Sequence, residues 1–438
     1  MTYKASRIAR VHARQILDSR GRPTVEAEVE LVDGSFGRSC VPSGASTGRH
    51  EAIELRDHNT SQYDGLGVGQ AVNNVRSEIA DRLLGEDALD QRQIDRLLIS
   101  LDGSANLSRL GANAVLATSM AVCRAAAVHS HNPLYRYINS LCRGRPMSLP
   151  LPMVNILSGG AHAGRGMDLQ DFLAIPMGAS SYSEALEMIS RVRVSATRLL
   201  ADRGYSVLLA DEGGLSPGFK HAHEALDLMV QSFEAAGLVP GQDMAIAIDV
   251  AASELFVNGR YELVRHGFQF SGEEMASFIT ECVRRYPIIS VEDALEQDDW
   301  LNWQTFTASV PGVQVIGDDL FVTNQKRITM GIECSAANGV LIKVNQNGTL
   351  SGTLDAMETA WRAGYTTVVS ARSGETEDTF IADLAVGTGA GQIKIGSVRS
   401  SERLAKYNQL LRIEEDQSLE FIGAAGLGRN TRQNVACN

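Results

Sequence analysis

Charged residues end a series of short apolar segments in the second part of the sequence. In chain order they are Glu212, Asp249, Glu292, Asp318, Lys343, Arg372 and Lys394. Helix-length segments such as HAHEALDLMVQSFEAAG separate the apolar runs, and this alternation predicts βα units with a parallel sheet. So long a series favours a closed (β/α) barrel, whose strands all end at the face where barrel enzymes bind substrates. Each residue alone could be a solvated loop residue, but the unbroken series predicts that the side chains meet in one site.

Three of these residues, Asp249, Glu292 and Asp318, are carboxylates from neighbouring predicted strands. Carboxylates held so close repel one another unless a cation lies between them. Oxygen ligands without a nearby His or Cys suit a hard ion. Mg²⁺ fits best, because it takes few carboxylates and keeps positions for water and substrate. The sequence therefore predicts a magnesium site.

Basic residues follow the acids along the chain. Lys343 and Lys394 are predicted at buried strand ends, where burial and neighbouring positive charge lower the pKa of a lysine and make it a usable base. Arg372 and Ser373 offer a forked donor and a hydroxyl that match a phosphate or carboxylate. Glu212, in ADEGGLSP, is placed as an acid opposite a lysine base. This set indicates removal of a proton next to a carboxylate, with a metal stabilising the enolate-like intermediate.

Two structural parts must position these residues. The alternating segment PTVEAEVELVDGSFGRSCV, with a turn at Asp33-Gly34, predicts a β-hairpin, and residues 69–128 have a helical period. The proline-containing segment 143–152 is interpreted as a linker. We therefore predict an α/β protein with an α+β capping domain at residues 1–142 and a (β/α) barrel at residues 143–438. No G-x-G-x-x-G motif follows the first strand, which argues against a dinucleotide fold.

Composition restricts the classes of partner. The 438 residues are 44% apolar and carry a formal net charge of −12, whereas nonspecific nucleic-acid or membrane binding needs a basic face. No apolar run is long enough to span a bilayer, and the N-terminus, MTYKASRIAR, lacks the apolar core of a signal peptide. The six cysteines are scattered without a C-x-x-C pair, as is typical of free thiols in a reducing compartment. We predict a cytoplasmic protein that binds neither nucleic acid nor membrane.

The sequence resembles the enolase (phosphopyruvate hydratase) family along nearly its whole length. The matching stretches are ARQILDSRGRPTVE, VPSGASTGRHEAIELRD, LGANAVLATSMAV, ADEGGLSP, AIDVAASE, PIISVED, IGDDLFVTN, LIKVNQNGTL, RSGETED and GQIKIGS. The resemblance implies an N-terminal α+β domain that caps an enolase-type (β/α)8 barrel. It also implies dependence on Mg²⁺ with two ions per active site, a small anionic phospho-acid substrate, and a homodimer.

The resemblance also implies roles for residues at matching positions. The ligands of the first metal would be Asp249, Glu292 and Asp318, and Ser46, in SGASTG, would be the mobile-loop ligand of the second. Lys343 would take the proton from C2 of the substrate. Glu212 would be the acid that helps hydroxide leave C3.

The substrate would be held by a further set of residues. Lys394 matches the partner of the substrate carboxylate and metal, and Arg372 with Ser373 matches the phosphate clamp. His162, in GGAHAG, and Gln170 match loop positions that close over substrate.

The sequence departs from the usual enolase pattern on the side that faces substrate. Ala371, in SARSGETED, stands where enolases have a histidine, and Asp171, in QDF, stands where they have a glutamate. The loop after GGAH reads AGRGMD and introduces Arg165, and Gly352 replaces an acid in GTLSG. Alanine and the shorter aspartate make room, and Arg165 adds positive charge. Room and charge together suit a larger or more anionic group at phosphorus.

These departures favour a dehydratase for a relative of 2-phosphoglycerate. The best fit is conversion of 2-phosphonoformylglycerate to carboxyphosphonoenolpyruvate, the reaction of the enolase-like carboxyphosphonoenolpyruvate synthases of phosphinothricin-type natural product biosynthesis. One alternative is an ordinary glycolytic enolase that forms phosphoenolpyruvate from 2-phosphoglycerate. The other is a non-catalytic binding protein on an enolase fold, which would not need a matched acid and base.

Overall fold

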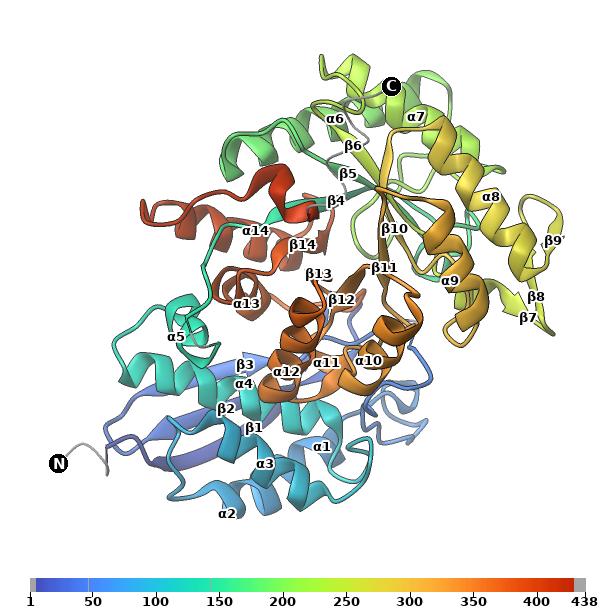
Figure 1. Ribbon diagram of the computed structural model, residues 1–438. Helices are drawn as coiled ribbons and strands as arrows, with labels where there is room; N and C mark the ends of the chain where they lie inside the picture. The colour runs from blue at the N-terminus through green and yellow to red at the C-terminus, as the bar shows by residue number, and fades with distance from the viewer. Residues whose placement is uncertain (1–4, 46, 143, 429–438) are drawn as a thin grey trace.

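The computed structural model describes residues 5–45, 47–142 and 144–428. Its N-terminal part is a small antiparallel sheet packed on helices, and its C-terminal part is a closed barrel surrounded by helices (Figure 1). The predicted fold class, an α+β part followed by a closed (β/α) barrel, is confirmed. Arg143, at the predicted domain boundary, lies outside the described residues, and the division at residues 142 and 143 stays a prediction.

The N-terminal sheet contains the predicted hairpin. Its strands are β1 (Ile8–Leu17), β2 (Pro23–Leu31) and β3 (Phe36–Cys40), paired antiparallel in that order. The helices of this part are α1 (Gly69–Asn74), α2 (Ala80–Leu83), α3 (Gln91–Asp102), α4 (Ala112–His129) and α5 (Leu134–Leu141). A π-helical turn, Val75–Ile79, joins α1 to α2.

Helix α4 lies directly against β2 and β3. Small residues fill it, and almost all of its side chains are buried. Gly37 of β3 allows the close approach, because an added Cβ would lie 2.1 Å from the carbonyl oxygen of Ala121 and 2.4 Å from the amide nitrogen of Ala125. The small-residue pattern therefore sets the distance between this helix and the sheet.

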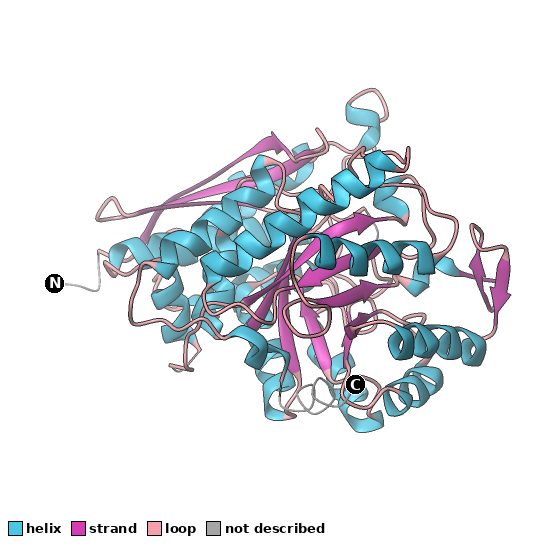
Figure 2. Ribbon diagram, turned by 90° about the horizontal axis from the view of Figure 1, so that it is seen from above, coloured by secondary structure: helices cyan, strands magenta, loops and turns pink. Residues whose placement is uncertain are grey.

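The barrel closes in the strand order β10-β11-β12-β13-β14-β4-β5-β6. Its strands are β4 (Leu151–Ser158), β5 (Asp171–Ile175), β6 (Ala245–Asp249), β10 (Ile288–Glu292), β11 (Gln314–Gly317), β12 (Gly339–Ile342), β13 (Thr366–Ser370) and β14 (Gly391–Gly396). The helices of this part are α6 (Tyr182–Asp202), α7 (Ala222–Ala235), α8 (Gly272–Arg285), α9 (Trp300–Ser309), α10 (Gln325–Cys334), α11 (Val344–Asn347), α12 (Leu350–Arg362), α13 (Phe380–Thr388) and α14 (Ser401–Glu414). A separate small sheet, β7 (Phe256–Val257), β8 (Arg260–Leu263) and β9 (Phe268–Phe270), projects beside the barrel (Figure 2).

The expectation of an all-parallel barrel is wrong at one strand. β5 pairs antiparallel with both of its neighbours, β4 and β6. It therefore returns the chain to the opposite end of the barrel, and two helices, α6 and α7, follow it in place of one. The connection between these helices lies at the face where the parallel strands end, where Leu215 pairs with Leu157 near the end of β4.

The segment YSVLLADE, predicted as a strand, belongs to this connection and forms no barrel strand. Leu208 is 75% exposed, and Val207 and Leu209 are also exposed. The barrel instead uses β4, which is buried along its whole length and begins inside the predicted linker 143–152. An apolar run of strand length was mistaken for a barrel strand, since length and composition alone do not show which runs are covered.

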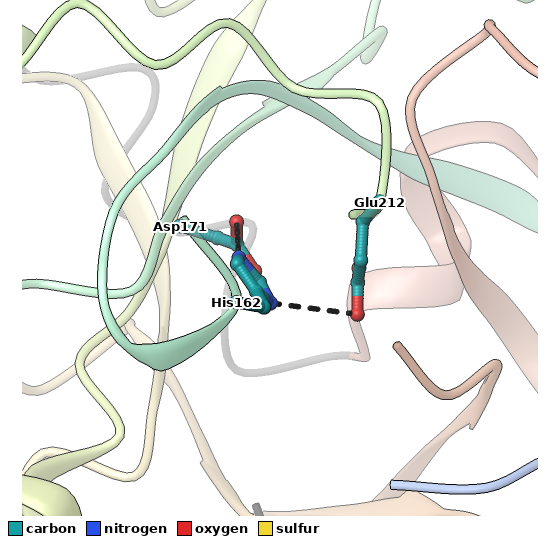
Figure 3. Close-up of side chains that lie close together, drawn as sticks. All are labelled: His162, Asp171 and Glu212. Atoms are coloured by element: carbon teal, nitrogen blue, oxygen red, sulfur yellow. Dashed lines mark hydrogen bonds and ion pairs between the residues drawn. The ribbon is translucent and has the colours of Figure 1, made fainter. Parts of the chain in front are cut away.

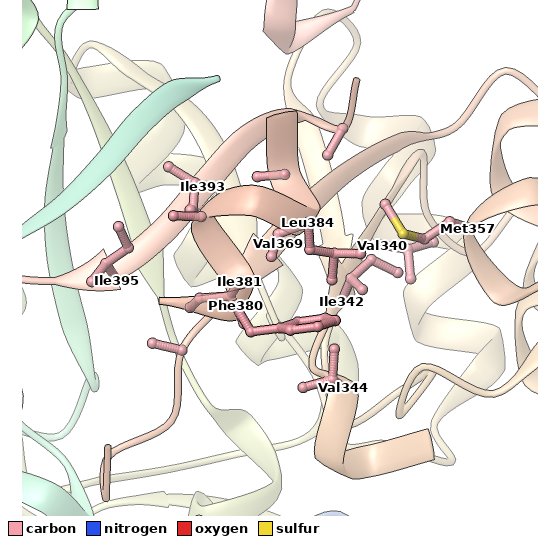
Figure 4. Packing of buried hydrophobic residues seen from close by; sticks show 14 of the residues in the cluster. Val340, Ile342, Val344, Met357, Val369, Phe380, Ile381, Leu384, Ile393 and Ile395 are labelled. Atoms are coloured by element: carbon pink, nitrogen blue, oxygen red, sulfur yellow. The ribbon is translucent and has the colours of Figure 1, made fainter. Parts of the chain in front are cut away.

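Apolar side chains form two clusters about the barrel wall. The interior cluster includes Ala247, Leu341 and Val368. The larger cluster fills the space between the strands and the outer helices, as Figure 4 shows for Val369, Ile393 and Leu384. Successive residues of a strand thus enter different clusters, as the alternation of strand side chains requires.

The sequence also led to predictions about membrane-spanning helices and about the cysteines. Among the residues described, no helix is long and apolar enough to cross a membrane. Within the same part of the chain the cysteines, Cys40, Cys123, Cys142, Cys282 and Cys334, are free thiols, as predicted.

A Gly37→Ala substitution tests the packing of α4 on the sheet. The added methyl would overlap the backbone of Ala121, so we expect the free energy of unfolding to fall by about 1–3 kcal/mol. Urea denaturation followed by circular dichroism measures this change. Val32→Ala, at an exposed position of the same hairpin, is the control and should change the value by less than about 0.5 kcal/mol. Equal stability of Gly37→Ala and the wild type would contradict the packing argument.

Candidate active site

Alternation along the barrel strands aims charged side chains at the barrel mouth. Ala247 of β6 belongs to the interior cluster, so Asp249, two residues on, faces the same way. Leu341 of β12 also belongs to the interior cluster, so Lys343, two residues on and just after β12, faces the same way. Further residues that alternation places inward are Asp171, Glu292, Asp318 and Lys394.

The carboxylates at the mouth are buried and share one lysine. The Lys394 ammonium lies 2.7 Å from Asp249 Oδ2 and 2.7 Å from Glu292 Oε2. Burial, together with the nearby charge of Asp249, raises the pKa of Glu292 well above its usual value. Its second oxygen, Oε1, has no hydrogen-bond partner among the described residues. A buried, all-oxygen donor set with a spare oxygen fits a hard cation such as Mg²⁺.

A second acidic group adjoins this set. Asp293, Asp318 and Asp319 place carboxylate oxygens within 4.8 Å of one another. Asp293 accepts hydrogen bonds of 2.8 Å from the backbone N–H groups of Asp318 and Asp319. These bonds fix the loop that follows β11 and so orient Asp318 toward the mouth.

Lys343 pairs with Asp318 in this structure. Gln346 donates to the other oxygen of that carboxylate at 2.8 Å. Burial disfavours the charged lysine, but the attraction of Asp318 outweighs it, and the pKa of Lys343 lies above its usual value. The expectation of a lowered pKa is therefore wrong for the protein alone. It did not include a carboxylate in direct contact with the ammonium.

Glu212 reaches the mouth from the connection between α6 and α7. Asn155 of β4 donates to its Oε2 at 3.4 Å, and His162 Nδ1 lies 3.8 Å from its Oε1 (Figure 3). The His162 Nε2 is 3.2 Å from Asp171 Oδ1, which also accepts a 2.7 Å hydrogen bond from Ser158. The imidazole thus lies between two carboxylates.

This arrangement sets the charge of each group. Burial disfavours the imidazolium, but the attraction of Asp171 and its hydrogen bond outweigh burial and raise the pKa of His162 to about 9. Burial would raise the pKa of Glu212, but the charge of His162 and of other nearby cations lowers it below its usual value. Glu212 is therefore ionised at neutral pH, and it must take up a proton before it can act as an acid.

Arg372 and Ser373 follow β13 and are almost completely buried. Arg372 pairs with Glu51 at 2.9 and 3.3 Å and donates to Asn345 Oδ1 at 3.1 Å. The Ser373 hydroxyl accepts a 2.7 Å hydrogen bond from the backbone N–H of Ala45. Two donors from consecutive residues thus face the same pocket as Lys343.

The N-terminal part supplies site residues that the sequence analysis did not single out. They are Glu51 on Arg372, Ala45 on Ser373 and Arg20, whose guanidinium lies 3.4 Å from the Ser373 hydroxyl. The signal was present in the stretch VPSGASTGRHEAIELRD, which contains Ala45 and Glu51. From this stretch the sequence analysis singled out Ser46 alone, as a metal ligand. Ser46 lies outside the described residues.

Of the other residues singled out from the sequence, Gln170 lines the pocket and Arg165, Ala371 and Gly352 lie outside its lining. Gln170 lines the pocket and donates to Asp249 Oδ2 at 3.1 Å. Arg165 is 73% exposed in its side chain and pairs with Glu254 at 3.4 Å, outside the described pocket lining. Ala371 is buried beside β14, its N–H bonded to the Lys394 carbonyl, and its methyl belongs to the larger apolar cluster rather than to that lining. Gly352 is in the first turn of α12, beside Asn347.

The pocket itself is small. It is lined by Ala45, Ala161, His162, Gln170, Glu212, Lys343, Arg372 and Ser373, and encloses about 20 Å³. That space holds about one water molecule. A phospho-acid is larger than this space, so its binding requires displacement of side chains that line the pocket.

Asp171→Asn tests the charge arrangement around His162. Loss of the carboxylate charge should lower the pKa of His162 from about 9 by at least about one unit. The raised pKa means that the ion pair stabilises the fold fully below pH 6.5 and that this contribution disappears as the pH rises through 9. NMR titration of the imidazole without added metal measures the shift. Ser158→Ala, which keeps the carboxylate, is the control, and an unchanged pKa in Asp171→Asn would contradict the assignment.

Comparison with protein families accounts for nearly the whole chain. Residues 8–138 match the enolase N-terminal domain, and residues 146–431 match the enolase C-terminal TIM barrel domain. The barrel with its capping part and the acid, lysine and arginine groups at its mouth agree with this match. The chain belongs to the enolase family and is a hydro-lyase of that family.

Proposed function

We propose that this hydro-lyase removes water across C2 and C3 of a 2-phosphoglycerate analogue, with Lys343 as base and Glu212 as acid. The observation that carries the proposal is that both residues line one small pocket together with Arg372 and Ser373. A base, an acid and an anion clamp in one pocket are what a 1,2-elimination next to a carboxylate requires.

Each step of the proposed reaction is assigned to particular residues of this chain. Neutral Lys343 takes the proton from C2, and the electron pair forms the enolate of the substrate carboxylate. Protonated Glu212 then donates to the C3 hydroxyl, the C3–O bond breaks, water leaves and the C2=C3 double bond forms. Lys394 neutralises the carboxylate end of the substrate, while Arg372 and Ser373 hold the phosphorus group.

Members of this family generally depend on Mg²⁺, and Asp249, Glu292 and Asp318 are the residues that would hold it. Bound there, Mg²⁺ would stabilise negative charge on the substrate carboxylate and draw the charge of Asp318 away from Lys343. A second ion with Ser46 among its ligands belongs to the same proposal.

For the substrate we propose 2-phosphonoformylglycerate, converted to carboxyphosphonoenolpyruvate. The support is Ala371 in place of a histidine beside the clamp, and Asp171 in place of a glutamate, whose shorter carboxylate is held by His162 and Ser158. A carboxylate on phosphorus needs more room than a phosphate oxygen. Arg165 would have to leave Glu254 and turn inward to contact it. The predicted homodimer and cytoplasmic location also remain proposals.

The assignment of base and acid has a direct test. Lys343→Ala should abolish exchange of the substrate C2 proton with solvent and lower kcat by at least about a thousandfold. Glu212→Gln should keep the exchange and lose dehydration, because the proton is removed but hydroxide is not protonated. Proton NMR in D₂O measures exchange, and absorbance of the enol ester measures dehydration. Full exchange in Lys343→Ala would show that another residue is the base.

The substrate is tested by comparing two compounds on the wild-type protein with Mg²⁺. We expect kcat/KM for 2-phosphonoformylglycerate to exceed that for 2-phosphoglycerate by at least about tenfold, because alanine at position 371 takes less space next to the clamp than a histidine would. Ala371→His should reverse the preference, since the imidazole would fill that room. Efficient turnover of 2-phosphoglycerate alone would identify an ordinary enolase activity and reject the proposed substrate.

A further inference from the structure

A second cavity lies away from the barrel mouth, between the N-terminal helices and α12. It measures about 310 Å³ and is lined by Arg92 of α3, Leu141 and Cys142 at the end of α5, Gly144, Arg145, and Leu354, Glu358, Trp361 and Arg362 of α12. This volume is within the range of pockets that bind small organic molecules. None of these residues takes part in the chemistry described above.

The arginines that line this cavity differ in their ion pairs. Arg92 pairs with Asp355 at 2.8 Å, and Arg362 pairs with Glu358 at 2.5 Å. Arg145 differs, because no carboxylate of the described residues lies within ion-pair distance of its guanidinium. Its Nε donates to the Thr388 carbonyl at 3.4 Å, and burial lowers the pKa of Arg145 despite the opposing effect of the nearby Cys142.

The position of Arg145 is fixed by an aromatic ring. The centre of its guanidinium lies 3.8 Å from the centroid of the Trp361 ring, and the indole N–H is held by the Thr367 hydroxyl at 3.0 Å. Stacking on indole stabilises the cation and leaves its edge N–H groups available to an acceptor. Leu141 and Leu354 add apolar walls beside this charge.

We propose that this cavity binds a small organic oxyanion, a carboxylate or phosphate monoester with an apolar body. Arg145, stacked on Trp361, takes the anionic group, and the leucines contact the apolar body. Inorganic phosphate should bind more weakly because it makes no use of the apolar walls. The site would join α3 and α5 to α12, and α12 follows the short helix α11 that begins after Lys343.

Phenyl phosphate is a suitable probe, with binding followed by tryptophan fluorescence. We expect saturable quenching in the wild type, loss of most of that signal in Trp361→Phe, and at least about tenfold weaker binding in Arg145→Gln. Arg136→Gln is the matched control. Arg136 also lies over an aromatic ring, Tyr135, but it pairs with Asp416 at 2.5 Å and lines no part of the cavity.

Unchanged affinity in Arg145→Gln, or no saturable quenching in the wild type, would overturn the proposal. Inorganic phosphate that binds as tightly as phenyl phosphate would overturn the organic part of it. Dehydratase turnover in Arg145→Gln equal to that of the wild type shows that the variant is folded and that lost binding reports on the cavity.

Discussion

Buried negative charge at the barrel mouth is the constraint on which the rest of the site depends. Asp249, Glu292 and Asp318 are held near one another in a place where isolated carboxylates would be strongly destabilised. In the protein alone Lys394 bridges the first two and Lys343 pairs with the third. The lysines are therefore part of the charge balance, in addition to the roles proposed for them in the reaction. A cation bound to the same oxygens would change the charge state of both.

The N-terminal part completes this balance from outside the barrel. Glu51 neutralises Arg372, and the Ala45 N–H fixes the Ser373 hydroxyl. An incoming phosphorus group would compete with Glu51 for the same guanidinium. If Arg372 holds the phosphorus group as proposed, binding of substrate would be linked to the position of the capping part, because the Arg372–Glu51 contact would be exchanged for a contact with substrate.

Much of this arrangement was predictable from strand ends. Asp249, Glu292, Asp318 and Lys343 end or follow short buried strands, Lys394 lies inside β14 two residues before its end, and strand alternation brings all of them to one mouth. Glu212 was placed at the mouth for the wrong reason, because its segment is an exposed connection between two helices. The reversed strand β5 is short, and nothing in DFLAI distinguishes antiparallel from parallel pairing. The Arg372–Glu51 pair was not predictable from either segment alone, since more than three hundred residues separate its members.

The reversal of β5 has a consequence for how such an enzyme can diversify. A barrel of uniform βα units presents one loop per strand at its mouth. Here the inverted strand replaces two strand-to-helix loops with a strand-to-strand connection, β4–β5 with His162 and Gln170, and a helix-to-helix connection, α6–α7 with Glu212. Asp249, Glu292 and Lys343 end or follow strands of the sheet, whereas these two connections lie outside the strands and are attached through contacts of individual residues, such as Gln170 to Asp249 and Leu215 to Leu157. Lengthening of these connections, or substitutions in them that spare Glu212, could therefore alter which molecule is accepted while the charged strand ends stay in place.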